Sequence, residues 1–218
     1  NSPFQAESIS EFWRRWHMTL SRFLRDYLYI PLGGSRKGEG RQLANLFLTM
    51  LACGLWHGAS WTFVAWGGLQ GIYLVINHLW SQWFRPGVAP GRLLRAGYLC
   101  LTLLAVTVSW AFFRADSMAH AGSILQALIR PEPSGIAGID SADLVFVCAL
   151  MVLALFAPNS NQMLGYSFGT PEPPAPAPAW LRWTPSKRHA VLTGVLLFVS
   201  GLTGLAGREQ LAFLYFQF

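Results

Sequence analysis

The sequence of 218 residues contains few charged side chains, and this scarcity limits the classes of protein it can belong to. Charged residues make up 12% of the chain, about half of what a soluble domain of this size usually carries. Hydrophobic residues make up 53%, with ten Trp and fifteen Phe, which excludes a disordered chain. The composition therefore disfavours an ordinary cytosolic globule and predicts a membrane protein.

Formally charged residues are missing altogether from residues 42–84. One bilayer crossing needs about 20 apolar residues, so this stretch is long enough for two crossings. The net charge of +6 does not indicate a nucleic-acid partner, because a basic nucleic-acid binder keeps its Lys and Arg on an exposed stripe. We therefore expect the lipid bilayer, and no nucleic acid, to be a partner of this chain.

Several common chemical signatures are also missing. The three cysteines, at positions 53, 100 and 148, lie singly in apolar runs, so we expect neither a disulfide framework nor a zinc site. The sequence has no HExxH motif, no His-x4-Asp box and no paired carboxylates of the glycosidase type. Residues 165–169 fit GxSxG, but a proline-rich segment follows where a nucleophile elbow needs a helix. No cleavable signal peptide is visible.

Apolar residues in the first thirty positions recur at three- and four-residue steps, which predicts a helix over residues 4–30. A serine at position 8 or 10 is expected to cap its start, and Ser8 and Glu11 have the spacing of a capping box. Pro31 and the Gly33-Gly34 pair should end the helix and open a basic loop. The many Trp, Tyr and Arg residues suit the membrane–water interface.

The predicted fold class is all-α: a polytopic membrane protein with about five transmembrane helices and additional interfacial amphipathic helices. The expected apolar helices cover residues 42–57, 60–80, 96–113, 144–157 and 190–206, with a surface helix over 116–130 and an extended linker over 170–178. Thirteen of the sixteen Lys and Arg fall in residues 11–41, 82–95 and 180–189. The positive-inside rule places these segments in the cytoplasm.

His57 is the first candidate for chemistry because it lies inside the uncharged stretch, far in sequence from any carboxylate. An ionisable side chain there is costly unless it faces a cavity or a partner. Gly54 and Gly58 have GxxxG spacing, which would let a helix or a slender ligand approach the backbone beside the imidazole. Burial favours the neutral ring that a general base requires. The alternative is a histidine that hydrogen-bonds between helices for packing alone.

His17 is the second candidate, because it also lies among Trp residues and precedes the same hydrophobic segment. Taken alone, it is equally well explained as an interfacial side chain. The other three histidines lie at predicted helix ends or on an amphipathic face and are interpreted as solvated: His78, His120 and His189. Arg36 and Lys37, beside the Gly-Gly pair, would attract an anionic group.

Two long strings carry a family resemblance: SISEFWRRWHMTLSRFLRDYLYIPLGGSRKG over residues 8–38 and LTMLACGLWHGASWTFVAWGGLQGIY over residues 48–73. They resemble the membrane-bound O-acyltransferase (MBOAT) superfamily, in its bacterial branch typified by the membrane subunit of alginate O-acetylation. The later SWAFFRADSMAHA and the terminal LYFQF resemble the same branch. The resemblance spans nearly the whole chain and is strongest over residues 8–72.

The resemblance implies roles for individual residues. His57 matches the catalytic histidine, and His17 matches a second motif position that is Asn in many sterol- and glycerolipid-acylating relatives. Further positions match as substrate-binding, tunnel-wall or structural groups: Trp13, Trp16, Arg25, Asp26, Tyr27, Asn45 and Trp56. Members of the family carry a further N-terminal half, so we expect residues 1–218 to be the C-terminal part of such a protein. Its parts would be an interfacial helix and basic loop (1–41), a histidine-bearing membrane hairpin (42–80) and further spans (93–218).

The resemblance also implies the reaction, which is acetyl transfer from acetyl-CoA as donor substrate, with no bound cofactor or metal. The acceptor would be a hydroxyl of an exported polysaccharide, or a periplasmic partner that passes the acetyl group on. The expected location is the bacterial inner membrane. Two rival functions remain: a proton-coupled transporter or pore subunit in which His57 and His17 line the path, and a non-catalytic scaffold that docks a soluble enzyme through residues 8–41.

Overall fold

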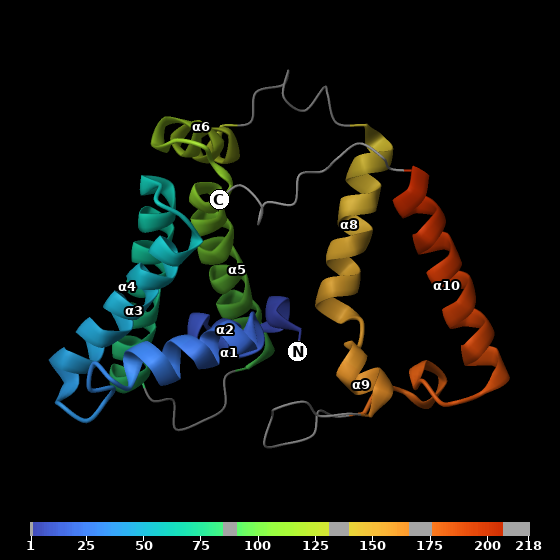
Figure 1. Ribbon diagram of the computed structural model, residues 1–218, viewed down its shortest axis with the longest axis horizontal. Helices are drawn as coiled ribbons and strands as arrows, with labels where there is room; N and C mark the ends of the chain where they lie inside the picture. Colours follow the sequence, from blue (N-terminus) through green and yellow to red (C-terminus); the bar gives the residue numbers. More distant parts are fainter. Residues whose placement is uncertain (1, 85–90, 131–139, 166–175, 207–218) are drawn as a thin grey trace. The chain divides into compact units, whose positions relative to one another are not determined.

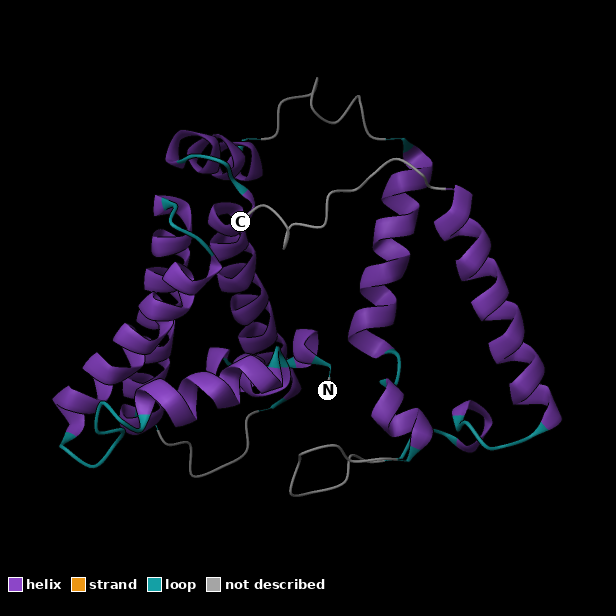
Figure 2. Ribbon diagram, in the orientation of Figure 1, coloured by secondary structure: helices purple, strands orange, loops and turns teal. Residues whose placement is uncertain are grey.

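The structure is a computed structural model that describes residues 2–84, 91–130, 140–165 and 176–206. Every regular element in these ranges is helical, as Figures 1 and 2 show, which confirms the predicted all-α class. Contacts along the chain define two compact units, Asn1–Ala157 and Pro158–Phe218. Both candidate histidines lie in the first unit.

The long apolar helices form close to the predicted positions. The first unit contains α1 (Ile9–Arg15), α2 (Met18–Leu24), α3 (Glu39–His57), α4 (Trp61–Trp83), α5 (Arg92–Arg114), α6 (Met118–Ile129) and α8 (Ser141–Phe156), with the short helices η1 (Pro3–Gln5) and η2 (Arg25–Tyr29). The second contains α9 (Ser160–Leu164), η3 (Ala179–Leu181) and α10 (Lys187–Ala206). Residues 166–169 of the GxSxG motif and residues 170–175 of the expected linker lie outside the described residues.

Among the described helices, α5 alone combines the length and the apolar composition needed to cross a bilayer. The helices α6 and α8 are apolar but shorter. Large apolar side chains of α8 and α10 are exposed, including Phe156 at 79% and Phe198 at 66%. Exposed apolar surface of this kind is typical of contact with lipid or with another protein. The count of five membrane spans stays a prediction.

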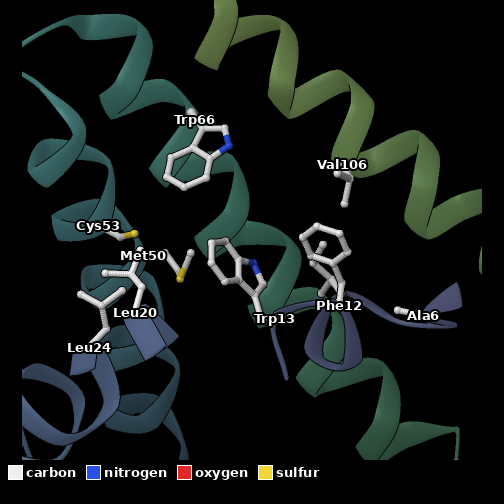
Figure 3. Close-up of a cluster of buried hydrophobic side chains, with 10 residues drawn as sticks. Ala6, Phe12, Trp13, Leu20, Leu24, Met50, Cys53, Trp66 and Val106 are labelled. Carbon is white, nitrogen blue, oxygen red and sulfur yellow. The ribbon is translucent and has the colours of Figure 1, made fainter. Parts of the chain in front are cut away.

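The single helix expected over residues 4–30 is wrong, because the chain breaks at Trp16–His17. His17 has a left-handed conformation (φ 43°, ψ 48°), and α2 restarts immediately after it. The predicted start is confirmed, since the Ser8 hydroxyl accepts a hydrogen bond from the Glu11 backbone N–H at 3.2 Å. The break redirects α2, whose Leu20 joins a buried cluster with residues of α3 and α4 (Figure 3). Apolar periodicity continues across the break and therefore does not reveal it.

Helices α3 and α4 form a tight antiparallel hairpin in which glycines allow the two backbones to touch. A Cβ atom added to Gly54 would overlap the Phe63 carbonyl oxygen, and one added to Gly67 would lie 2.5 Å from the Met50 carbonyl oxygen. Gly54 therefore has the close-approach role expected from the sequence. Gly58 follows the last residue of α3 and caps this helix in a conformation (φ 152°) that favours glycine.

A buried chain of hydrogen bonds joins α1, α4 and α5. The Trp13 indole N–H donates to Gln70 Oε1 at 2.9 Å, and Gln70 Nε2 donates to the Ser109 hydroxyl at 2.7 Å. The Ser109 hydroxyl donates in turn to the Val106 carbonyl oxygen at 2.7 Å. Gln70 and Ser109 are completely buried. This network fixes the position of α1, and with it the turn that contains His17, against the α4–α5 pair.

Replacing Gln70 by leucine is expected to lower the free energy of unfolding by about 1–3 kcal/mol, because the buried Trp13 N–H then loses its acceptor. The loss should appear as unfolding at a lower SDS fraction when the complete protein is titrated in detergent micelles. Gln126→Leu, at an exposed position of α6, is the matched control. Equal stability of the two variants would contradict the assigned role of the network.

Candidate active site

His57 is the last residue of α3, and its half-buried ring lies among aromatic side chains from three helices. Trp66 of α4 and Phe113 of α5 contact it edge to face, with ring centroids 5.3 Å and 5.0 Å away. Trp56 and Phe63 complete the enclosure at 4.9 Å and 6.2 Å. The enclosure is largely apolar, so an imidazole there is shielded from bulk water on several sides.

No group among the described residues hydrogen-bonds to the His57 ring or forms an ion pair with it. Within these residues, the His57 ring takes part in packing through its aromatic contacts and through no hydrogen bond. Within the same ranges, no three His, Cys, Asp or Glu side chains converge as they would around a metal ion. Among the described side chains, the functional group at this site is the His57 imidazole, which aromatic rings enclose.

His17 is exposed and lies in the break between α1 and α2. Trp13, four residues before His17, contacts Trp66 with ring centroids 6.0 Å apart, and Trp66 contacts the His57 ring, so the fold brings the segment before His17 and the His57 ring into one region. The Ser21 hydroxyl lies 3.1 Å from the Trp13 carbonyl oxygen and 3.4 Å from that of Trp16, which satisfies the carbonyls at the end of α1. A left-handed conformation costs about 1–2 kcal/mol for a residue other than glycine. Such local strain is concentrated at functional sites.

The two tryptophans predicted to bind substrate have different surroundings. Trp13 belongs to the hydrophobic core, is 8% exposed, and uses its N–H in the bond to Gln70. Trp16 is half-buried, stacks on Phe12 at 5.8 Å, and contacts Trp110 at 5.6 Å. Trp13 therefore has a structural position, whereas one side of Trp16 remains accessible next to His17.

Asn45 attaches the glycine-containing turn to α3. It is 1% exposed, and its Nδ2 donates to the Gly34 carbonyl oxygen at 3.0 Å and more weakly to that of Leu32 at 3.4 Å. Gly33 and Gly34 both have positive φ angles, 114° and 54°, which explains the glycine pair. Asn45 thereby sets the position of the basic loop that begins in this turn.

Arg25 and Trp56, the remaining predicted substrate-binding residues, are both exposed. The Arg25 Nε donates to Asp26 Oδ1 at 2.7 Å, and this hydrogen bond lowers the pKa of the Asp26 carboxyl below its ordinary value. Trp56 contacts the His57 ring. Arg25 thus lies in the interfacial segment, whereas Trp56 lies at the enclosure itself.

Sequence reasoning missed Trp66, Phe113 and Gln70. Trp66 follows His57 by nine residues in the same uncharged stretch, so its proximity could have been inferred from a helical hairpin. Phe113 lies in another helix, and no local pattern connects it with His57. Gln70 is a polar side chain within an apolar helix, and this is only a weak indication in the sequence that it has a special role.

Comparison with known proteins shows which protein family this sequence is similar to. Residues 2–93, which include both histidines and α1–α4, match the sequence profile of MBOAT, the membrane-bound O-acyltransferase family. The resemblance read from the two sequence strings is thereby confirmed, and the MBOAT region contains His57, His17 and the α3–α4 hairpin.

Named relatives extend the similarity beyond the MBOAT region. The chain is similar to the probable alginate O-acetylase AlgI of Pseudomonas aeruginosa, with 33% identity over 263 aligned residues that cover 100% of this chain and 49% of that protein. It is also similar to the peptidoglycan O-acetyltransferase of Helicobacter pylori, with 43% identity over 129 residues, 59% of this chain and 24% of that protein. The chain thus spans about half the length of the alginate O-acetylase that it matches.

Proposed function

We propose that this chain is part of a membrane-embedded O-acyltransferase that transfers an acetyl group from acetyl-CoA to a hydroxyl of an exported polysaccharide. A periplasmic partner that carries the acetyl group onward is an equivalent acceptor. The proposal rests on one observation above all: the GLWHG histidine, within the residues that match the MBOAT model, ends α3 inside an aromatic enclosure. The inner membrane of a bacterium is the proposed location.

In this proposal His57 accepts the proton of the attacking hydroxyl. The hydroxyl oxygen bonds to the thioester carbonyl carbon, the carbonyl electron pair moves to oxygen, and collapse of the tetrahedral intermediate expels the thiolate. The thiolate takes the proton from the His57 imidazolium. General base catalysis of this kind contributes about 10²–10⁴-fold. The aromatic enclosure supports this role because it keeps water away from the thioester.

His17 and the basic segment have supporting roles in the proposal. His17 orients the acceptor or donates a hydrogen bond to the oxyanion, and its exposed position in the break between α1 and α2 leaves its ring nitrogens available for this role. The exposed Arg36 and Lys37 attract the phosphate groups of the donor from the cytoplasmic side. The named relatives act on alginate and on peptidoglycan, which supports a glycan acceptor without identifying it.

The test uses the complete coding sequence, expressed in a host strain that lacks its own copy. Membranes are supplied with acetyl-CoA labelled in the acetyl group, and we expect label in alkali-labile ester on the exported polysaccharide or on a periplasmic protein. Mass spectrometry of the same material should show an increase by one acetyl group per modified hydroxyl. Flux of protons or solute without any acetylated product would contradict the proposal and favour a transporter.

A further inference from the structure

Trp66 carries a buried hydrogen-bond donor that the reaction scheme above does not use. The side chain is 4% exposed, and its indole Nε1–H has no hydrogen-bond partner among the described residues. Buried N–H groups in folded proteins are nearly always paired, so an unpaired one calls for an explanation. Trp13, another buried tryptophan of the same core, has its N–H fully used by Gln70. The two core tryptophans therefore differ in this respect. The other buried side-chain atom without a partner among the described residues, the acceptor Asn45 Oδ1, belongs to the residue that holds the glycine-containing turn.

The unpaired donor lies on a ring that forms part of the His57 enclosure. The Trp66 ring is nearly perpendicular to the His57 ring, at 88°, and contacts Phe113 at 5.2 Å. In Figure 3 the indole nitrogen is on the edge turned toward α5, away from Met50 and Cys53. The helix α5 carries Phe113, which contacts both His57 and Trp66. The ring that carries the unpaired donor thus forms part of the enclosure around His57, the proposed proton acceptor.

We propose that the Trp66 N–H donates a hydrogen bond to the carbonyl oxygen of the acyl thioester and stabilises the oxyanion that forms there. This inference rests on the proposed acyl transfer. When the hydroxyl attacks and its proton passes to His57, the carbonyl electron pair moves onto this oxygen, which then accepts the bond from Trp66. Collapse returns the pair to the carbonyl, breaks the carbon–sulfur bond, and the thiolate takes the proton from His57. A preorganised donor in a water-poor site is most effective at this step.

The kinetic test replaces Trp66 by phenylalanine in the complete protein, with Trp80→Phe on the same helix as the control. With acetyl-CoA and the host's chemically deacetylated exported polysaccharide, we expect Trp66→Phe to lower kcat by about 10²–10³-fold. The KM for acetyl-CoA should change by less than about threefold, because the bond strengthens in the transition state. Trp80 stacks on Phe84 near the end of α4, and its variant should retain wild-type kinetics. A change in KM alone, or unchanged kinetics, would overturn the inference.

An indole isostere separates the N–H from the shape of the ring. Benzothienylalanine at position 66, introduced by stop-codon suppression, keeps the bicyclic ring but replaces the N–H by sulfur. We expect it to be as impaired in kcat as Trp66→Phe. Recovery of wild-type kcat by this isostere would show that only ring packing matters and would overturn the inference.

A binding measurement distinguishes failure of this inference from failure of the proposed function. In His57→Gln protein with ¹⁵N-labelled tryptophan, the Trp66 indole N–H resonance should shift when acetyl-CoA is added and should shift less with free CoA. If wild-type protein transfers acetyl groups but this resonance does not respond, the role of Trp66 is wrong while the function stands. If wild-type protein transfers no acetyl group at all, the proposed function itself is wrong.

Discussion

Replacing His57 by glutamine is expected to reduce acetyl transfer by about 10²–10⁴-fold. Glutamine is similar in length and polarity, but it does not take up the proton that the attacking hydroxyl must release. Because the His57 ring forms no hydrogen bond with the described residues, its replacement breaks no hydrogen bond among them, and glutamine occupies part of the same space among the aromatic rings. Protein level and membrane insertion should therefore stay close to wild type. The acetyl ester content of the exported polysaccharide, relative to membrane protein, is the quantity to measure.

His78→Gln is the matched control for this substitution. His78 lies near the other end of α4, where its Nε2 is 3.0 Å from Gln82 Nε2, outside the aromatic enclosure. We expect near-normal acetylation in this variant. Turnover of the His57→Gln protein within a few-fold of wild type would remove the proposed base and would favour the scaffold function, in which both histidines are replaceable.

Replacing Gly67 by alanine should have the largest effect on the fold. The added methyl group would lie 2.5 Å from the Met50 carbonyl oxygen and 3.1 Å from the Gly54 Cα, and both are backbone atoms that do not rotate away. Overpacking of this kind costs about 1–3 kcal/mol and more where backbones must separate. Because α3 carries His57 and α4 carries Trp66, separation of the hairpin should also reduce acetyl transfer. Thermal unfolding of the complete protein in detergent measures the stability loss.

The neighbouring glycine provides the control for this experiment. A Cβ atom at Gly68 would meet only Leu51 Cδ1, at 4.0 Å, which is ordinary van der Waals contact. Gly68→Ala should therefore be neutral or stabilising by about 0.5–1 kcal/mol, since alanine is the better helix former. If both alanine variants unfold at the wild-type temperature, the backbone contact between α3 and α4 is not what holds the hairpin.

The two residues that define the site are held by different physical means. His57 is placed by the glycine-mediated hairpin and by the turn at Gly58, both of which are backbone features. His17 is placed by a strained turn that the Ser21 hydroxyl supports and that Trp13 connects to Gln70. Conformational strain is thus located at His17, whereas the described contacts of the His57 ring are with aromatic side chains.

The sequence by itself determined the helical class, the positions of the long apolar helices and the Ser8 cap, and it marked His57 as the first candidate for chemistry. These properties depend on hydrophobic periodicity, local capping chemistry and residue type, all of which are encoded within a few neighbouring residues. The MBOAT resemblance also followed from contiguous strings, and the comparisons confirmed it.

The break at His17 and the contacts between distant segments became known only from the tertiary structure. The left-handed break at His17 is invisible to periodicity, because the apolar stripe continues across it while α2 turns to pack on α3 and α4. Phe113 reaches the His57 ring from a helix 56 positions away, and Gln70 acquires its role only when Trp13 and Ser109 approach it. Contacts between distant segments depend on how helices pack in three dimensions. Patterns of neighbouring residues in the sequence do not specify that packing.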